Sequence, residues 1–337
     1  MGNRHHADEK VREALAEAER TGKCCIAKSD ALRKSLQVRV QQGTVTQPMR
    51  GMYVASDRWA SLERREQYLW TARTLQAKHP EWVFCGFTAA VAHGMANTEL
   101  AMGKLVVAST TSNNQHLPNV IHHKTDISKV RTVRGIRVTP VGRTLFDCLR
   151  WMQFPIALAV ADGTLRSQLL TYSQAVQCIL DQEGSLGREQ ALEVLKFADP
   201  KCENGGESIV RALIIQSGFA APQSQVEFVD DMDSRHIMRV DFCWKIQRPD
   251  RVRTVALELD GLCKYTDPRF MNGFDSERVR SDERLRESRL VKQVDGLIRI
   301  SFKQALDQDY LIQLLDSVRV PHVAGIIPYG RTICTKW

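Results

Sequence analysis

The sequence has no paired-cysteine motif and no long apolar run, and these absences exclude several classes of protein. Its nine cysteines are scattered along 337 residues without any C-x-x-C pair, which argues for reduced thiols and against a disulfide framework or a structural zinc site. The apolar run Ile156–Ala161 ends at Asp162, well short of the roughly 18 residues that a membrane-spanning helix needs. The N-terminus is polar and lacks an apolar signal core, so we expect a cytoplasmic location and no membrane association.

Positive charge is unevenly distributed along the chain. The formal net charge is +8, and residues 1–80 hold 15 Lys and Arg against 9 Asp and Glu. A basic first segment favours a polyanionic partner, most simply nucleic acid. The length of the chain predicts two or three domains.

Residues 1–60 have the element order of a winged helix-turn-helix. Apolar spacing predicts a helix over residues 8–20, and a short strand or turn follows it. Two short helices are then expected before Gly43, the first with Ser29 as its N-cap. A hairpin that turns at Arg50 completes the order.

A polar row on the second short helix supplies candidate DNA contacts. In a winged helix-turn-helix, the second helix of the pair enters the major groove, and the wing tip touches the backbone or the minor groove. Arg side chains read guanine edges and Gln side chains read adenine edges. The alternative is that this row is the solvated face of a small helical domain. The candidate DNA-binding residues of the segment are Gln37, Arg39, Gln41, Gln42 and Arg50.

The middle segment, residues 61–200, has the pattern of a globular domain without an evident catalytic motif. Helical patterns alternate with short apolar strands, which predicts a mixed α/β fold. We interpret His93 as a helix-end residue and Arg143 with Asp147 as an ion pair on one helix. Pro, Gly and Asn cluster after Asp199 and mark a linker to a third segment.

Asp241 lies in an alternating apolar run within residues 201–337. The alternation places Val240, Phe242 and Trp244 on one side of a strand and Asp241 on the other. Strands usually exclude a carboxylate from such a position, because burial of an unpaired charge is unfavourable.

Three further carboxylates accompany Asp241. Seventeen residues later, a second β-rich run carries Glu258 and Asp260, which we expect to project together because residues two apart share a face of a strand. Glu207 opens an amphipathic helix after a Gly-Gly turn, where an acid also suits the positive helix end. Acids that converge from two strands predict a hard divalent cation, Mg²⁺ or Mn²⁺, bound by oxygen ligands.

The order of these residues resembles the PD-(D/E)XK nuclease superfamily, and more closely its very-short-patch-repair-like endonuclease domains. The resemblance covers roughly residues 205–306 and implies a mixed β-sheet flanked by helices. Asp260 stands where the superfamily usually has Lys, and Lys264 is the candidate for that positive charge from a shifted position. The matching features are Glu207, Val240-Asp241-Phe242, Glu258-Leu259-Asp260-Gly261, an Arg-rich segment from Arg278 to Arg289, and the closing strand Leu297 to Phe302.

A second resemblance covers the front of the chain. It is similar to the AbiEi-type antitoxin family of abortive-infection (type IV toxin–antitoxin) systems. That resemblance implies an N-terminal winged helix that binds DNA and regulates its own operon, and a toxin encoded nearby as a partner. The matching motifs are Arg50-Gly51-Met52-Tyr53-Val54, Thr88-Ala89-Ala90, His93-Gly94, Thr139-Pro140, Arg143-Thr144 and Asp147.

The sequence therefore predicts a multidomain α/β (α+β) protein with a winged helix-turn-helix at 1–60, a middle domain at 61–200 and an endonuclease-like domain at 201–337. The first functional hypothesis is a DNA-binding, metal-dependent endonuclease in phage defence or a toxin–antitoxin system. The alternative is a transcriptional regulator or antitoxin whose nuclease-like domain is inactive or docks a partner. Under either hypothesis, a homodimer is a candidate assembly. The nuclease hypothesis assigns Glu207, Asp241, Glu258 and Asp260 to the metal and to catalysis, Lys264 to catalysis, and Arg280 and Arg284 to DNA binding.

Overall fold

The structure is a computed structural model with a mixed α/β fold, as the sequence predicts at that level. It describes residues 2–96, 98–109, 117–232, 235–260 and 285–323, and the side chains from residue 8 onward. These residues form two compact units. Within the described ranges, the first unit runs up to Cys148 and includes Ser173–Glu183, and the second takes Leu149–Tyr172 and Gly184 onward. None of the helices in these ranges has the length and apolarity to cross a membrane.

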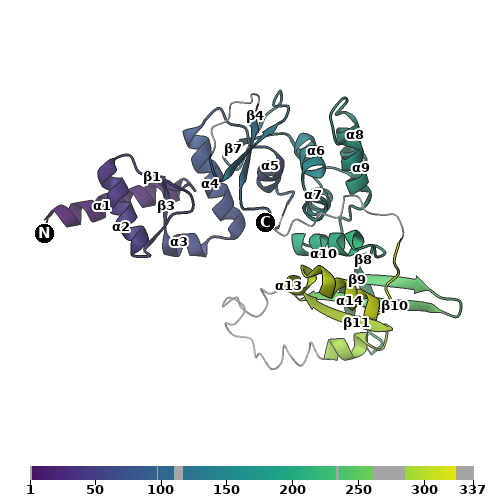
Figure 1. Cartoon of the computed structure of the whole chain (residues 1–337). Coiled ribbons are helices and arrows are strands. Elements are labelled where there is room, and N and C mark those ends of the chain that lie inside the picture. The colour runs from purple at the N-terminus through teal and green to yellow at the C-terminus, as the bar shows by residue number, and fades with distance from the viewer. Residues whose placement is uncertain (1, 97, 110–116, 233–234, 261–284, 324–337) are drawn as a thin grey trace. The chain divides into compact units, whose positions relative to one another are not determined.

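The first unit begins with two helices and a small sheet. The strands have the order β1-β3-β2 and pair antiparallel. Val11, Leu36, Val45 and Tyr53 form the core between α1, α2 and the sheet. The elements are α1 (Gly2–Arg20), β1 (Cys25–Ile26), α2 (Asp30–Gln41), β2 (Val45–Thr46) and β3 (Met52–Ala55), and Figure 1 labels all of them except β2.

The segment predicted as two short helices is one helix, α2, so that prediction is wrong. The Ser29 side chain caps its start by accepting a hydrogen bond from the Leu32 amide. No Gly or Pro interrupts the following residues, and nothing therefore breaks the helix before Gln41. The predicted C-terminal stop is confirmed, because Gly43 has φ +77° and its amide donates to the Val40 carbonyl.

The rest of the first unit is a mixed arrangement of helices and two-stranded sheets. β4 pairs parallel with β5, and β6 pairs antiparallel with β7. The sequence did not predict β5, whose polar residues His122 and His123 break the apolar pattern, or the short strand β6. The remaining elements are α3 (Ser56–Ser61), α4 (Arg64–Lys78), α5 (Gly86–His93), β4 (Leu105–Ser109), β5 (Val120–Lys124), β6 (Arg131–Val133), β7 (Ile136–Val138), α6 (Val141–Trp151) and α8 (Tyr172–Leu180).

The pair predicted on α6 is buried. Asp147 is fully buried and lies 3.1 Å from Arg143. Its Oδ2 atom also accepts a hydrogen bond from the Thr125 hydroxyl, at 2.6 Å. His93, at the end of α5, contacts the Thr139 carbonyl through Nε2, at 2.8 Å. These contacts join separate segments of the first unit, which favours the structural interpretation of the three polar side chains.

The second unit is built on a four-stranded mixed sheet with the order β11-β10-β9-β8. β8, β9 and β10 are antiparallel neighbours, and β11 runs parallel to β10. Residues 285–290 form a further helix between β10 and β11. The elements are α7 (Phe154–Arg166), α9 (Arg188–Lys196), α10 (Gly205–Gln216), β8 (Gln223–Val229), β9 (Ile237–Gln247), β10 (Val252–Asp260), β11 (Gly296–Ser301), α13 (Phe302–Ala305) and α14 (Gln308–Ser317).

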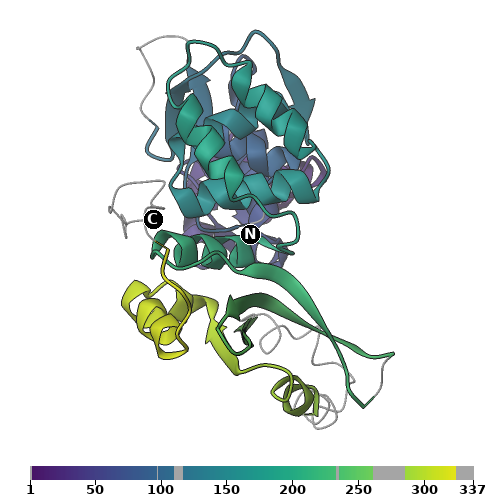
Figure 2. The same ribbon diagram turned by 90° about the vertical axis from the view of Figure 1, so that its right-hand side faces the viewer.

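Two apolar clusters cover the sheet. The larger one joins Phe242 and Leu257 to residues of α10 and α14, such as Ile214 and Leu315. The smaller one forms around Leu290 of the short helix. Figure 2 shows α10 and this helix on opposite sides of the sheet.

Helix α7 belongs to the second unit. It packs against α10 and is buried from Phe154 to Thr164. The second unit therefore begins at Leu149, whereas the sequence placed a boundary near residue 200. The assignment of three functional segments stays a prediction.

A buried acid on α7 makes the stability of this unit depend on pH. Asp162 is fully buried, and its Oδ1 atom accepts a hydrogen bond from the Asp199 amide at 2.7 Å. Burial raises the pKa of Asp162 to about 6, against the opposing effects of that amide and of Arg211. The folded state therefore holds this proton more tightly than the unfolded chain does, and the charge becomes unfavourable as the pH rises from about 4 to about 6.

We predict that Asp162→Asn stabilises the protein at neutral pH. Asn keeps the acceptor for the Asp199 amide and removes the buried charge. The free energy of unfolding of the variant should exceed that of wild type by an amount that grows between pH 4 and pH 7, up to about 3 kcal/mol. This figure corresponds to roughly two pKa units at about 1.4 kcal/mol each, and urea denaturation measures it. An equal difference at both pH values would contradict the assignment.

Candidate functional site

Asp241 and Glu258 lie at neighbouring positions of β9 and β10. The ladder between the two strands ends at the pair of Phe242 and Leu257, and Asp241 and Glu258 are the next residues of their strands beyond that pair. The Oδ2 atom of Asp241 accepts a hydrogen bond from the Leu259 amide at 2.7 Å, which ties the carboxylate to β10. Like charges opposite each other on neighbouring strands repel, so this pair of acids needs compensating positive charge.

Glu207 is held by the start of α10. The Asn204 side chain caps the helix by accepting from the Glu207 amide, and its Nδ2 atom donates to Glu207 Oε1 at 2.6 Å. The Glu203 amide donates to Oε2 at 2.7 Å. Burial raises the pKa of Glu207, and Asp241 adds to that effect, while the Glu203 amide and Gln225 oppose it.

Gln225 connects Glu207 with Asp241, and sequence reasoning missed it. Its Nε2 atom donates to Glu207 Oε2 at 2.9 Å and lies 3.3 Å from Asp241 Oδ1. A Gln in an alternating strand gives no signal of this role. The structure therefore brings two of the predicted acids together through an amide.

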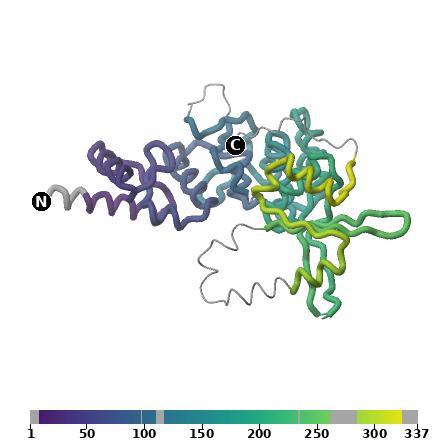
Figure 3. Tube along the Cα trace, turned by 60° about the horizontal axis from the view of Figure 1, so that its bottom comes forward, coloured from purple at the N-terminus to yellow at the C-terminus, as the bar shows by residue number. Residues whose placement is uncertain are grey.

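The backbone at Gln225 interrupts the sheet. Gln225 has φ +54°, a conformation that is unfavourable for a residue with a Cβ atom. The ladder between β8 and β9 pairs Ser224 with Phe242 and Val226 with Val240, and it skips the pair between them. Figure 3 shows the β8–β9 and β9–β10 hairpins leaving the sheet in different directions.

This interruption changes the predicted faces of β9. Phe242 and Trp244 pack in the larger cluster, but Val240 packs in the smaller cluster with Cys243. The expectation that Val240 shares a side with Phe242 and Trp244 is therefore wrong, because the side of β9 that faces each cluster changes between Val240 and Phe242.

Two arginines bind the carboxylate of Glu258. Arg286, on the helix of residues 285–290, donates from Nη2 to Oε1 at 2.6 Å. Arg299, which is paired with Glu258 across β10 and β11, lies with Nη2 2.9 Å from Oε2. These guanidinium groups supply the positive charge that the two acids require.

The remaining predicted site residues are less closely associated. Asp260 ends β10 and is exposed, whereas Glu258 is buried, so the two acids have different surroundings although they are two residues apart. Lys264, Arg280 and Arg284 lie outside the described residues. Arg289, which follows them, donates to the buried carboxylate of Asp230.

The donor set fits a magnesium-type ion better than a closed metal site. Within the described ranges, no group of three or more His, Cys, Asp or Glu side chains could hold a metal. Mg²⁺ commonly uses only one or two protein carboxylates and keeps several waters. Asp241 and Glu258 offer such a pair, provided that Glu258 leaves its arginine partners.

A hollow of about 770 Å³ opens beside Gln225. Polar side chains dominate its wall, among them Glu203 and Arg239, which form an ion pair at 2.5 Å. Lys201 contributes a second positive charge to the wall, and Asp199 and Glu227 contribute two further negative charges, so the lining holds three acids and two bases.

The candidate DNA contacts of the first unit separate into two groups. Gln37 donates to the Tyr53 hydroxyl at 2.9 Å, and Arg39 binds Asp8 and the Ser35 carbonyl. The second group, Gln41, Gln42 and Arg50, is exposed, as are Arg33 and Lys34, which sequence reasoning did not select.

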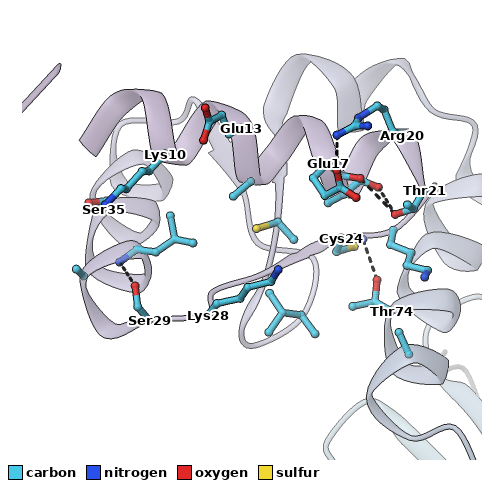
Figure 4. Close-up of a pocket in the computed structure, with 18 residues that line it drawn as sticks. Lys10, Glu13, Glu17, Arg20, Thr21, Cys24, Lys28, Ser29, Ser35 and Thr74 are labelled. Carbon is cyan, nitrogen blue, oxygen red and sulfur yellow. Dashed lines mark hydrogen bonds and ion pairs between the residues drawn. The ribbon is translucent and has the colours of Figure 1, made fainter. Parts of the chain in front are cut away.

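A second hollow, of about 840 Å³, lies between α1, α2 and α4. Figure 4 shows Cys24 at one side of it, where its amide donates to the Thr74 hydroxyl at 2.8 Å, and Lys28 and Ser29 farther along. Burial raises the pKa of Cys24 to about 12 and also raises the pKa of Cys25. Both thiols are therefore protonated at neutral pH and are poor nucleophiles or metal ligands.

Two mycobacterial proteins are similar to this chain. Uncharacterized proteins Rv2248 and MT2308 of Mycobacterium tuberculosis, from strains H37Rv and CDC 1551, are each 26% identical to it over 221 residues. The similarity covers 64% of this chain and 76% of each relative. No family model matches the sequence.

We predict that Gln225→Ala destabilises the second unit by about 1–2 kcal/mol, because it removes the donor shared by two carboxylates. The backbone strain is unchanged, since Ala has the same Cβ atom. The loss should be larger at pH 8 than at pH 5, because without the amide the pKa of Glu207 rises further and its charged form becomes less favourable. Gln223→Ala, on an exposed position of the same strand, is the matched control in urea denaturation at both pH values. Equal effects of the two variants would contradict the role of Gln225.

Proposed function

We propose that the protein is a DNA-binding, metal-dependent endonuclease of the PD-(D/E)XK type. The observation that carries the proposal is the placement of Asp241 and Glu258 directly beyond the last ladder pair of β9 and β10. The order of elements around them, α10, β8, β9, β10, a short helix and β11, is compatible with the mixed sheet that the superfamily resemblance implies. Glu207 opens the first helix of this series, as the resemblance requires.

Asp241 and Glu258 would hold Mg²⁺ or Mn²⁺ through carboxylate oxygens. Such an ion lowers the pKa of a bound water and stabilises the charge that grows on a phosphodiester. Gln225 orients Asp241 and connects it to the buried Glu207. Asp260, at the exposed end of β10, and Lys264 remain proposed contributors.

In this proposal the first unit delivers the nuclease to DNA. α2 precedes the β2–β3 hairpin, which is the position of the recognition helix in a winged fold. Its exposed residues Lys34, Gln41 and Gln42 and the hairpin residue Arg50 would contact DNA. A toxin–antitoxin or phage-defence setting is consistent with the family resemblances. In a toxin–antitoxin system, the partner of this protein would be the toxin.

The second candidate function is a regulator or antitoxin whose nuclease-like unit does not cut. The ion pairs of Glu258 with Arg286 and Arg299 favour it, because they satisfy the carboxylate without a metal. In that case the four-stranded unit would bind a partner or nucleic acid through its arginines, and the first unit would determine the DNA site.

We predict that purified protein cleaves DNA in the presence of Mg²⁺ or Mn²⁺ and that EDTA abolishes the cleavage. Asp241→Asn and Glu258→Gln keep the size of each side chain and should each lower the rate by at least about 100-fold. Asp250→Asn, at an exposed acid in the β9–β10 turn, is the control and should cleave normally. Absence of cleavage of plasmid and single-stranded DNA, with DNA binding intact, would favour the regulator.

For the first unit, we predict that Lys34→Ala and Arg50→Ala each weaken duplex binding severalfold. If each side chain contacts one phosphate, each variant should also lower the salt dependence of binding, the slope of log K against log salt, by about one unit. Lys78→Ala, at an exposed lysine at the end of α4, should leave both quantities unchanged. Fluorescence anisotropy at several salt concentrations measures them, and no difference between Lys34→Ala and Lys78→Ala would exclude α2 from the interface.

A further inference from the structure

We infer that Arg286 and Arg299 form a phosphate-binding pair that Glu258 covers until a divalent cation draws its carboxylate away. The inference rests on the proposed function in one respect, namely that a divalent cation binds Asp241 and Glu258. The phosphate-binding role of the two arginines does not depend on it. It assigns the DNA backbone, a phosphodiester, as the ligand of the two guanidinium groups.

Two arginines bind the carboxylate of Glu258 at the same time. Both oxygens of Glu258 are engaged, at 2.6 Å from Arg286 and at 2.9 Å from Arg299. The Glu258 side chain is only 10% exposed, whereas those of Arg286 and Arg299 are 25% and 29% exposed. The acid is thus enclosed, while the guanidinium groups border on solvent and can reach an incoming ligand.

The acids of this group outnumber the arginines by one. Asp241, Glu258 and Glu287 contribute three negative charges, and Arg286 and Arg299 contribute two positive charges. A divalent cation bound between Asp241 and Glu258 would leave a surplus of one positive charge at short range, which repels the arginines from Glu258. An anion restores the balance, and the planar guanidinium fork suits the oxygen atoms of a phosphodiester.

Other contacts keep the arginines near the site when Glu258 leaves them. Arg286 also donates to the Arg239 carbonyl at 2.8 Å. Arg299 lies 3.7 Å from Glu287, on the same short helix as Arg286. The pair therefore remains in place, and its partner changes from a carboxylate to a phosphate.

A titration with Mn²⁺ alone, without DNA, tests the competition for Glu258. Arg299→Gln and Arg286→Gln each remove one competitor and should tighten Mn²⁺ binding about tenfold, the scale of one hydrogen bond to a charged group. Arg239→Gln removes the same charge from β9 without touching Glu258 and should change the affinity much less. Arg299→Lys retains the charge and should give an intermediate affinity. If Arg239→Gln tightened Mn²⁺ binding equally, the effect would come from the loss of any nearby positive charge. That result would overturn the idea that the arginines and the cation compete for Glu258.

Binding of a short DNA duplex to the full chain tests the phosphate ligand, with Ca²⁺ as a cation that need not support cleavage. In wild type, Ca²⁺ should steepen the salt dependence by up to about two units, one for each phosphate contact. Glu258→Gln removes the negative charge that binds the arginines, without a metal, and should show the steeper slope in EDTA. The double variant Arg286→Gln, Arg299→Gln should show the shallow slope with and without Ca²⁺. A shallow slope for Glu258→Gln in EDTA would overturn the phosphate-binding pair.

The two proposals fail in different ways. Weak or absent Mn²⁺ binding in wild type and in all variants would remove the metal-dependent nuclease, and the slope of Glu258→Gln in EDTA would still test the arginine pair. Normal Mn²⁺ binding and cleavage with unchanged slopes would keep the nuclease and remove the pair. Thermal unfolding of each variant in EDTA establishes that it is folded before its slope is compared.

Discussion

The placement of two carboxylates on adjacent positions of a sheet is the constraint on which the second unit depends. Such acids repel each other and lose hydration, so the surrounding structure must supply donors and positive charge. Here each acid has its own solution. Asp241 uses a backbone amide and Gln225, whereas Glu258 uses guanidinium groups from a helix and a neighbouring strand. The position of the helix of residues 285–290 on the sheet follows partly from this need.

Residues near the start and near the end of the same helix attach it to the rest of the unit. Arg289 donates to Asp230, whose pKa is held at about 2, mainly by the Met232 amide and further by Arg289 and His236. Leu290, the residue after Arg289, is fully buried in the smaller apolar cluster of the sheet. One apolar anchor and two arginines therefore locate a helix too short to be stable on its own. Any function of the site depends on this attachment, because Arg286 reaches Glu258 from it.

The sequence predicted features that depend on neighbouring residues better than features that depend on distant ones. The N-cap at Ser29, the stop at Gly43 and the strand positions of Asp241 and Glu258 follow from local patterns, and the structure has them. Local rules failed where tertiary contacts decide. The strand β5 forms through pairing with β4 despite its polar residues. The bridging role of Gln225 requires three elements that meet only in the fold.

The arginine partners of Glu258 illustrate the same limit. Arg299 is an ordinary residue of an apolar strand until the parallel pairing of β10 with β11 places it opposite the acid. An acid pattern in a sequence thus identifies where charge is concentrated, but not which groups neutralise it. That distinction separates a fold prediction from a prediction of activity, and it is why the two functional hypotheses both remain compatible with the acidic motif.

The buried thiol beside the hollow of the first unit has a consequence for how motion in that unit can be observed. Burial raises the pKa of Cys24 to about 12, so the thiol is protonated at neutral pH. Its reaction with a thiol reagent therefore requires an opening that returns the sulfur to water. In a variant that lacks the other eight cysteines, the rate of labelling would measure that opening.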